Sequence, residues 1–210
     1  MSLPQSALLF SYDDYLAMER EGDERHEYLD GSLYAMAGES LEHSTINANL
    51  TGMLYGQLRG KPCRTLSPNM KVLSGEYRKG QTRGLFSYPD VTVVCGEPKF
   101  LDERRDVLLN PSLIIEVLSP GTEAFDRGEK FRRYRQHLAS LQAFVLVSTH
   151  LPLIELYQRQ AEGFWLYSAM SDYVETLPLA AIHCQLSLAE VYERVEFAPI
   201  VEDQVVEDQD

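Results

Sequence analysis

Residues 88–94 read Tyr-Pro-Asp-Val-Thr-Val-Val and residues 113–120 read Leu-Ile-Ile-Glu-Val-Leu-Ser-Pro, and these two segments decide the fold. Both are rich in β-branched and apolar residues, which is typical of short strands that are covered on both faces. Each segment nevertheless contains one acid, Asp90 in the first and Glu116 in the second. A carboxylate buried in such a strand costs several kcal/mol unless a cation or several hydrogen bonds compensate it.

These two acids predict a divalent metal site. Side chains alternate along a strand, so Glu116 shares one face with Ile114 and Leu118. Neither segment supplies a neighbouring lysine or arginine, and hard cations prefer carboxylate oxygens. A bound cation can polarise a phosphate and lower the pKa of a water molecule, so two such carboxylates form a minimal site for phosphodiester hydrolysis. Either acid alone has a simpler explanation, since an Asp after proline often begins a strand and a single Glu often lies on an edge strand.

Around these segments the chain alternates helical and strand patterns. This order predicts an α/β fold with a central mixed β-sheet flanked by helices. We expect helices between Ser11 and Gly22 and over residues 41–58, 123–137 and 188–194, strands over 64–73, 91–95, 112–119 and 143–148, and hairpins over 27–37 and 154–169. Residues 75–87 and 97–110 are polar or charged and predict loops.

Length and charge limit the class of protein. A chain of 210 residues suggests one domain, over residues 1–196, followed by an acidic and disordered tail over residues 197–210. The net charge is −13, of which residues 190–210 contribute −7 because eight acids stand against one arginine, which leaves −6 elsewhere. Any affinity for nucleic acid is therefore expected to be weak or confined to one cleft. One basic cluster survives, made of Arg127, Lys130, Arg132, Arg133 and Arg135.

The cysteines and the N-terminal sequence indicate the cellular compartment that we expect for the protein. Cys63, Cys95 and Cys184 form no CxxC pair and no obvious disulfide framework, which favours a reducing compartment. No basic and apolar leader begins the chain, and no apolar run approaches the roughly 18 residues that cross a bilayer. We therefore expect a cytoplasmic protein without a membrane partner.

Several motifs together resemble a known family. Pro89-Asp90, twenty-five intervening residues and Glu116-Val117-Leu118 resemble the core of the PD-(D/E)XK nuclease superfamily. Further segments resemble the Uma-type family of restriction endonucleases: His-Glu-Tyr-Leu-Asp-Gly at 26–31, Tyr-Ala-Met-Ala-Gly at 34–38, Met-Lys-Val at 70–72, Glu-Val-Leu-Ser-Pro-Gly-Thr at 116–122, Asp-Arg-Gly-Glu-Lys at 126–130 and Arg-Tyr-Arg at 133–135. The resemblance extends over residues 10–195.

The resemblance implies a fold, an activity and a set of site residues. It implies a restriction-endonuclease-like core and a Mg²⁺-dependent endodeoxyribonuclease that acts on DNA, with a homodimer expected. It implies that Asp90 and Glu116 bind Mg²⁺ or Mn²⁺ together with the backbone carbonyl of Val117. Glu27 corresponds to an upstream acid that completes or orients the metal site, although a simply solvated carboxylate is the plainer interpretation.

The chain departs from the superfamily pattern at Leu118, which stands where a lysine is expected. A lysine there would orient the attacking water and stabilise developing negative charge, and leucine does neither. Lys130 is the first candidate to replace it, since Lys130 and Tyr134 are spaced i, i+4 on one helix face. The alternative is that Lys130 merely pairs with Asp126. Lys71 is the second candidate.

Two other functions stay open from the sequence. Leu118 and the acidic charge favour a catalytically silent nucleic-acid-binding or regulatory protein that retains the nuclease fold. The other function is that of a protein-interaction domain whose partner recognises the acidic tail. His43 could contact substrate or support the metal site, but a lone histidine near a helix start is more often a cap or a surface residue.

Overall fold

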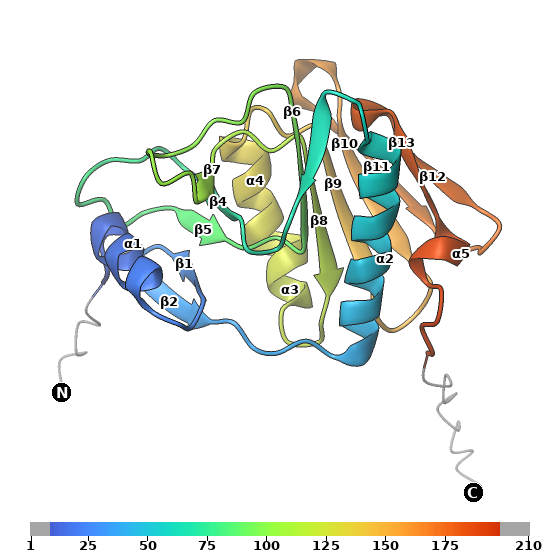
Figure 1. Cartoon of the computed structure of the whole chain (residues 1–210), viewed down its shortest axis with the longest axis horizontal. Coiled ribbons are helices and arrows are strands. Elements are labelled where there is room, and N and C mark those ends of the chain that lie inside the picture. The colour runs from blue at the N-terminus through green and yellow to red at the C-terminus, as the bar shows by residue number, and fades with distance from the viewer. Residues whose placement is uncertain (1–8, 198–210) are drawn as a thin grey trace, which may run out of the picture.

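The structure, a computed structural model, describes residues 9–197, so nearly all of the expected acidic tail lies outside it. Most strands belong to two mixed sheets, one of six strands in the order β11-β10-β9-β8-β6-β3 and one of five in the order β2-β1-β5-β4-β7 (Figure 1). The larger sheet contains β3 (Cys63–Leu66), β6 (Val91–Cys95), β8 (Leu113–Leu118), β9 (Ala143–Ser148), β10 (Ile154–Arg159) and β11 (Trp165–Met170). The smaller contains β1 (His26–Leu29), β2 (Ser32–Ala35), β4 (Lys71–Ser74), β5 (Leu85–Ser87) and β7 (Val107–Leu108).

The two acid-bearing segments are neighbours at the centre of the larger sheet. Strand β6 pairs antiparallel with β8, with Val91 opposite Ile115, and β8 pairs parallel with β9. Every residue of β8 is buried, and so is every residue of β9. Continuous apolar runs suit these strands because elements cover the sheet on both sides.

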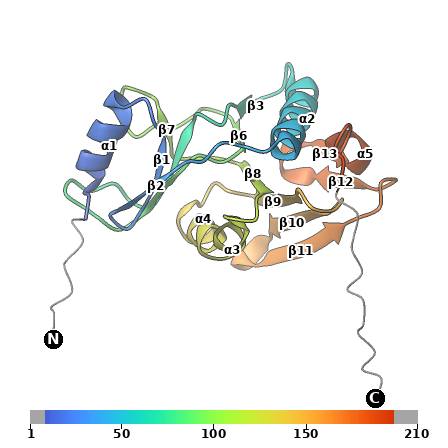
Figure 2. The same cartoon turned by 90° about the horizontal axis from the view of Figure 1, so that it is seen from below.

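Alternate residues of β8 pack against different helices. Leu113, Ile115 and Val117 join a core with α2 (Leu41–Leu58), a two-stranded hairpin of β12 (Thr176–Leu179) and β13 (Cys184–Ser187), and α5 (Leu188–Val191). Ile114 and Leu118 join a second core with Phe131 and Tyr134 of α4 (Phe131–His137). Figure 2 shows α2 and α4 on opposite sides of the sheet. A third core joins α1 (Tyr12–Glu21) to the smaller sheet.

The helix predicted over residues 123–137 forms, but its middle is wound differently. It runs from α3 (Glu123–Phe125) through a π-helical segment (Asp126–Lys130) into α4. Short π-helical segments inside α-helices are frequent at functional sites. Here the segment carries both Asp126 and Lys130 inward, and both side chains are buried.

The other helix and hairpin predictions are confirmed, although the last helix, α5, ends at Val191 and not at residue 194. Helix α1 begins with a capping box, in which the hydroxyl of Ser11 and the carboxylate of Asp14 each accept a backbone N–H bond from the other residue. The β1–β2 hairpin turns at Asp30 and Gly31, which both have positive φ, as a two-residue turn of this type requires. Helix α2 has the predicted bounds.

Several strand predictions were wrong. The single strand expected over residues 64–73 is two strands, β3 and β4, which lie in different sheets. The turn that holds Pro68 separates them, because proline supplies no N–H to a sheet ladder. The segment 75–87, expected to be a loop, ends in the buried strand β5, and the charged segment 97–110 contains β7. The β12–β13 hairpin was not predicted.

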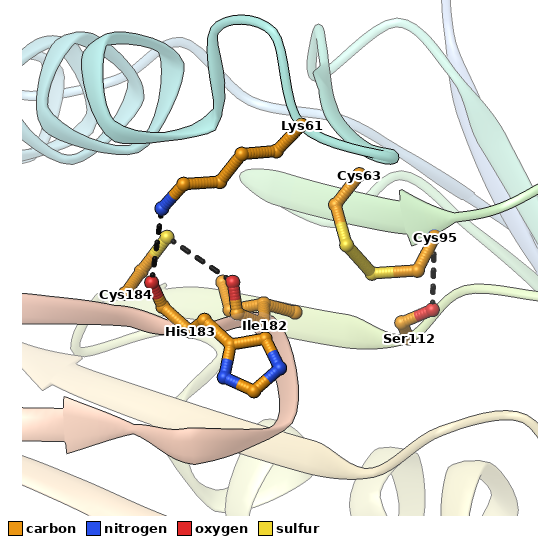
Figure 3. The surroundings of a disulfide bond; sticks show 7 residues. All are labelled: Lys61, Cys63, Cys95, Ser112, Ile182, His183 and Cys184. Atoms are coloured by element: carbon orange, nitrogen blue, oxygen red, sulfur yellow. Dashed lines mark hydrogen bonds between the residues drawn. A yellow bond between two sulfur atoms is a disulfide. The ribbon is translucent and has the colours of Figure 1, made fainter.

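The expectation that no cysteines pair is also wrong. Cys63 and Cys95 form a disulfide across β3 and β6, where the register places them directly opposite each other (Figure 3). They are 32 residues apart in sequence, so only strand pairing brings them together. Cys184 is the free cysteine and is buried. The cysteines therefore no longer argue for a reducing compartment.

Across residues 9–197, no helix is both long enough and apolar enough to cross a bilayer.

The disulfide can be tested by counting thiols and by measuring stability. In denaturant without reductant we expect one reactive thiol per chain, that of Cys184, and three after reduction. Replacing both Cys63 and Cys95 by serine should lower the free energy of unfolding by about 3 kcal/mol, since the crosslink restricts the unfolded chain. Three thiols before reduction would show that the bond does not form.

Candidate active site

A cavity of about 420 Å³ opens where the two sheets meet. Its walls come from the β1–β2 hairpin and the segment after it, the start of α2, the adjoining ends of β6 and β8, and the π-helical segment. Five residues predicted from the sequence line it: Glu27, Asp90, Glu116, Val117 and Lys130. They come from four separate elements, which the fold brings together at this cavity.

Asp90 stands directly before β6 and faces β8. Extending the β6–β8 register by one step places Asp90 opposite Glu116. Its Oδ2 accepts a hydrogen bond from the backbone amide of Val117 at 2.7 Å. This bond holds the Asp90 carboxylate at the rim of the cavity and leaves its other oxygen free for a ligand.

Glu116 lies deeper and is held by two partners. Its residue is only 3% exposed. The hydroxyl of Tyr134 donates a hydrogen bond to Oε1 at 3.0 Å, and the ammonium of Lys130 lies 3.4 Å from the same oxygen. Burial raises the pKa of Glu116 well above its usual value, and although Lys130 opposes this, the nearby acids Asp126, Asp90 and Glu27 add to it.

Lys130 is the central cation of the cavity. Its Nζ lies 2.9 Å from Asp126 Oδ1, 3.1 Å from Glu27 Oε1 and 3.4 Å from Glu116 Oε1. Burial lowers the pKa of Lys130, but the surrounding carboxylates, first of all Glu116 and Glu27, outweigh it and hold the pKa well above the usual value. Lys130 therefore pairs with Asp126, as one interpretation expected, and its ammonium also reaches Glu116.

Glu27 is fixed by more than its contact with Lys130. It lies in β1, and its side chain is 18% exposed. The backbone amide of Tyr88 donates a hydrogen bond to its Oε1 at 3.2 Å. Glu27 thus ties the smaller sheet to the segment that precedes Asp90, an arrangement that a solvated surface carboxylate would not show.

Lys71, the second candidate, is not brought to the cavity. Its ammonium lies 3.2 Å from Asp106 Oδ2 and 5.4 Å from the centre of the Tyr88 ring. Tyr88 lines the cavity and Lys71 does not. Partial burial raises the pKa of Asp106, but Arg20 and Lys71 outweigh it and bring the pKa down to about 2.

His43 belongs to the cavity, although the sequence favoured a cap or surface role. Its side chain is only 12% exposed, with Nε2 3.5 Å from Asp90 Oδ2 and Nδ1 3.6 Å from Glu39 Oε2. Burial lowers the pKa of His43, but Asp90, Glu39 and the Val117 carbonyl outweigh it and raise the pKa. The missed signal is its position three residues after the N-cap Ser40, where a side chain points back over the helix end.

These side chains form a site that can hold a divalent cation. One ligand atom each from Glu39, His43 and Asp90 lies within 4.8 Å of the others. Glu116 and Glu27 stand outside this group of three and contact Lys130 instead. Carboxylate oxygens suit Mg²⁺ and Mn²⁺, whereas an imidazole nitrogen suits transition metals such as Zn²⁺ and Fe²⁺. The five acids that line the cavity, against one lysine, give it a strongly negative potential: Glu27, Glu39, Asp90, Glu116 and Asp126.

Comparison with known sequences shows a family. The Uma2 family, described as "Putative restriction endonuclease", matches residues 12–190. An uncharacterized protein of Synechocystis sp. (strain ATCC 27184 / PCC 6803 / Kazusa) is 36% identical over 191 residues, which cover 89% of this chain and 93% of that protein. A second uncharacterized protein of the same organism is 31% identical over 157 residues, which cover 75% of this chain and 85% of that protein.

Comparison with solved structures supports the fold. The crystal structure described as a putative nuclease belonging to DUF820 from Anabaena variabilis ATCC 29413 matches with a TM-score of 0.67. The match covers 87% of this chain and 97% of the other, at 16% sequence identity. At this level of identity the likeness shows the fold alone.

The ion pairs of Asp106 predict a dependence of stability on pH. The folded-state pKa of about 2 lies below the ordinary value, so the contribution is complete above about pH 4 and is lost as the pH falls towards 2. We expect Asp106→Asn to lower the free energy of unfolding by about 1 kcal/mol at neutral pH, allowing for solvent screening. Urea unfolding at pH 7, 4 and 3 should show this difference narrowing below pH 4. A difference that stays constant would contradict the assignment.

Proposed function

Since the chain belongs to the Uma2 family, we propose that it is a metal-dependent endonuclease that hydrolyses phosphodiester bonds of DNA. One observation carries the proposal. Asp90 and Glu116, from neighbouring strands, line the same cavity as the buried Lys130, which arrives from a different element. Carboxylates and a cation in one cavity are the groups that hydrolysis of a phosphodiester needs. Two such sites related by a two-fold axis can cut both strands of a duplex in one encounter, so we also propose a homodimer.

The residues present fit a divalent cation. Asp90 would hold it together with His43 and Glu39, and we propose that Glu116 and the carbonyl of Val117, which line the same cavity, complete its ligands. The buried Nδ1 of His43 has no hydrogen-bond partner among the described residues, as expected of a group that supports a ligand site. When bound, Mg²⁺ or Mn²⁺ supplies Lewis-acid activation of the phosphate and of a water molecule.

Lys130 takes the place of the absent motif lysine at Leu118. It comes from the helix that packs on the Leu118 face of the sheet, and its Nζ lies beside Glu116. A scissile phosphate in the cavity would bring its non-bridging oxygens towards this ammonium. Lys130 would then stabilise the negative charge that develops as water attacks phosphorus. Glu27 holds Lys130 on one side, and Tyr134 orients Glu116 on the other.

Removal of either carboxylate should abolish cleavage. We expect Asp90→Asn and Glu116→Gln each to lower the rate of Mg²⁺- or Mn²⁺-dependent cleavage of plasmid DNA by at least about 100-fold, because each removes a cation ligand. Glu103→Gln, an exposed acid on the segment 97–110, is the matched control and should cut at the wild-type rate. Wild-type cleavage by Asp90→Asn would overturn the proposal. Metal binding without any cleavage by the wild type would favour a silent nucleic-acid-binding protein instead.

Replacement of Lys130 should have opposite effects on metal affinity and on the rate of cleavage. Lys130→Met removes a positive charge that contacts Glu116 and Glu27, so Mn²⁺ should bind about tenfold more tightly in calorimetry. Cleavage should nevertheless fall by about 100-fold, since the charge-stabilising group is gone. Lys71→Met is the matched control, because Lys71 is buried outside the cavity. Loss of cleavage in Lys71→Met alone would identify Lys71 as the functional lysine.

A further inference from the structure

A second cavity has the opposite charge to the first. It has a volume of about 980 Å³ and lies between α4 and the loop 75–84, which joins β4 to β5 (Figure 1). We call it the basic groove. Its lining includes five lysines and arginines against two acids, Asp30 and Glu76, in a chain whose net charge is −13. The cations are Arg78, Lys79, Arg83, Arg132 and Arg133.

The acidic cavity creates a need for such a surface. Five carboxylates line it against one lysine, so it repels a polyanion everywhere except at a bound cation. A nucleic acid strand is held mainly by positive charge along its phosphates. The positive charge that holds the strand must therefore lie beside the cavity, and the basic groove supplies it.

Two cations of the groove are free to bind a phosphate. Arg133 is engaged by Asp30 and Glu129, and Arg132 by Glu129. Lys79 and Arg83 are exposed, and within residues 9–197 neither side chain forms an ion pair. Neither charge is therefore held in a direct ion pair, although Asp13 lies close enough to Lys79 to interact with it electrostatically.

The floor of the groove has an unsatisfied donor. Ser74 lines the groove and is fully buried, and its hydroxyl has no hydrogen-bond partner in the described part of the chain. Leaving a buried hydroxyl unpaired costs about 1–3 kcal/mol. The oxygen is shielded from solvent, so a phosphate in the groove does not reach it, and Ser74 is not one of the proposed phosphate contacts.

The basic groove and the acidic cavity share two wall elements, which are β1 with its turn and the helix that carries Lys130 and Arg133. Glu27 pairs with Lys130 in the cavity, and three residues further along both segments Asp30 pairs with Arg133 in the groove. Three residues of extended chain span about 10 Å. That distance corresponds to about three base-pair steps measured along the axis of duplex DNA, at about 3.4 Å per step.

We propose that the basic groove binds the sugar–phosphate backbone of the DNA strand whose scissile phosphate lies in the acidic cavity, with Lys79 and Arg83 as the phosphate contacts. This inference rests on the proposed nuclease function, because it assigns the path of that enzyme's substrate. It gives an acidic protein one confined surface for nucleic acid.

Charge reversal tests the groove in the absence of metal. The variant carries Lys79→Glu and Arg83→Glu, and its matched control carries Lys99→Glu and Arg104→Glu, an exposed lysine and arginine that line neither cavity. Binding of a fluorescein-labelled 20-base-pair DNA is followed by anisotropy in EDTA at several salt concentrations. The groove variant should bind at least about tenfold more weakly, and the slope of log K against log salt should fall by about 2. The control should retain at least half of the wild-type affinity.

Three results would overturn the proposal. The first is that the groove variant binds DNA with wild-type affinity. The second is that the control loses as much DNA affinity as the groove variant, which would indicate an effect of net charge alone. The third is that the wild type does not bind DNA at low salt. Hydrolysis of bis(p-nitrophenyl) phosphate with Mn²⁺ separates this inference from the proposed function. The groove variant should hydrolyse this small diester at the wild-type rate and show a raised KM for DNA only. If the wild type hydrolyses neither substrate but binds DNA through the groove, the proposed nuclease function is wrong. The proposed binding of DNA by the basic groove is then retained.

Discussion

The architecture depends on one buried ammonium group surrounded by three carboxylates. Lys130 joins Glu27 of the smaller sheet, Glu116 of the larger sheet and Asp126 of its own helix. Other side-chain bonds reinforce this junction: the Tyr134 hydroxyl contacts both Ser87 of the smaller sheet and Glu116 of the larger sheet, and Arg133 pairs with Asp30. Because each of these acids needs a compensating charge, the position of the helix relative to both sheets is strongly constrained.

Such a cluster is a poor device for stability alone. Taking several charges out of water costs more than a hydrophobic replacement of similar volume would, so buried ions are weak evidence for stabilisation. Glu116 and Lys130 are nevertheless almost wholly buried at the wall of an open cavity. Perturbed ionisable groups that line a cavity are characteristic of functional sites, and the π-helical segment beneath them fits the same interpretation.

Charge is also divided in space. The acids gather where a cation would be held, and the free lysine and arginine of the loop 75–84 lie beyond the next ion pair along β1 and the helix. A net charge of −13 therefore does not describe what a substrate meets at each surface. This separation lets one cavity attract a cation while the neighbouring groove attracts phosphates, whereas mixed charges in one place would cancel both fields.

Local patterns in the sequence were enough to predict helix α2, the helix over residues 123–137, the β1–β2 hairpin, and the apolar strands that carry Asp90 and Glu116, because periodicity, caps and turn residues act over a few positions. The resemblance to the nuclease family, and not a local pattern, pointed to Glu27 and Lys130. Local patterns could not predict contacts between distant segments. These contacts are the Cys63–Cys95 bond, the pairing of strands into two separate sheets, the contact of His43 with Asp90 and the ion pair of Lys71 with Asp106. The sequence by itself determined which residues would be buried or charged, and only the tertiary structure decided which charges meet, because strand register and helix position set distances that no local pattern encodes.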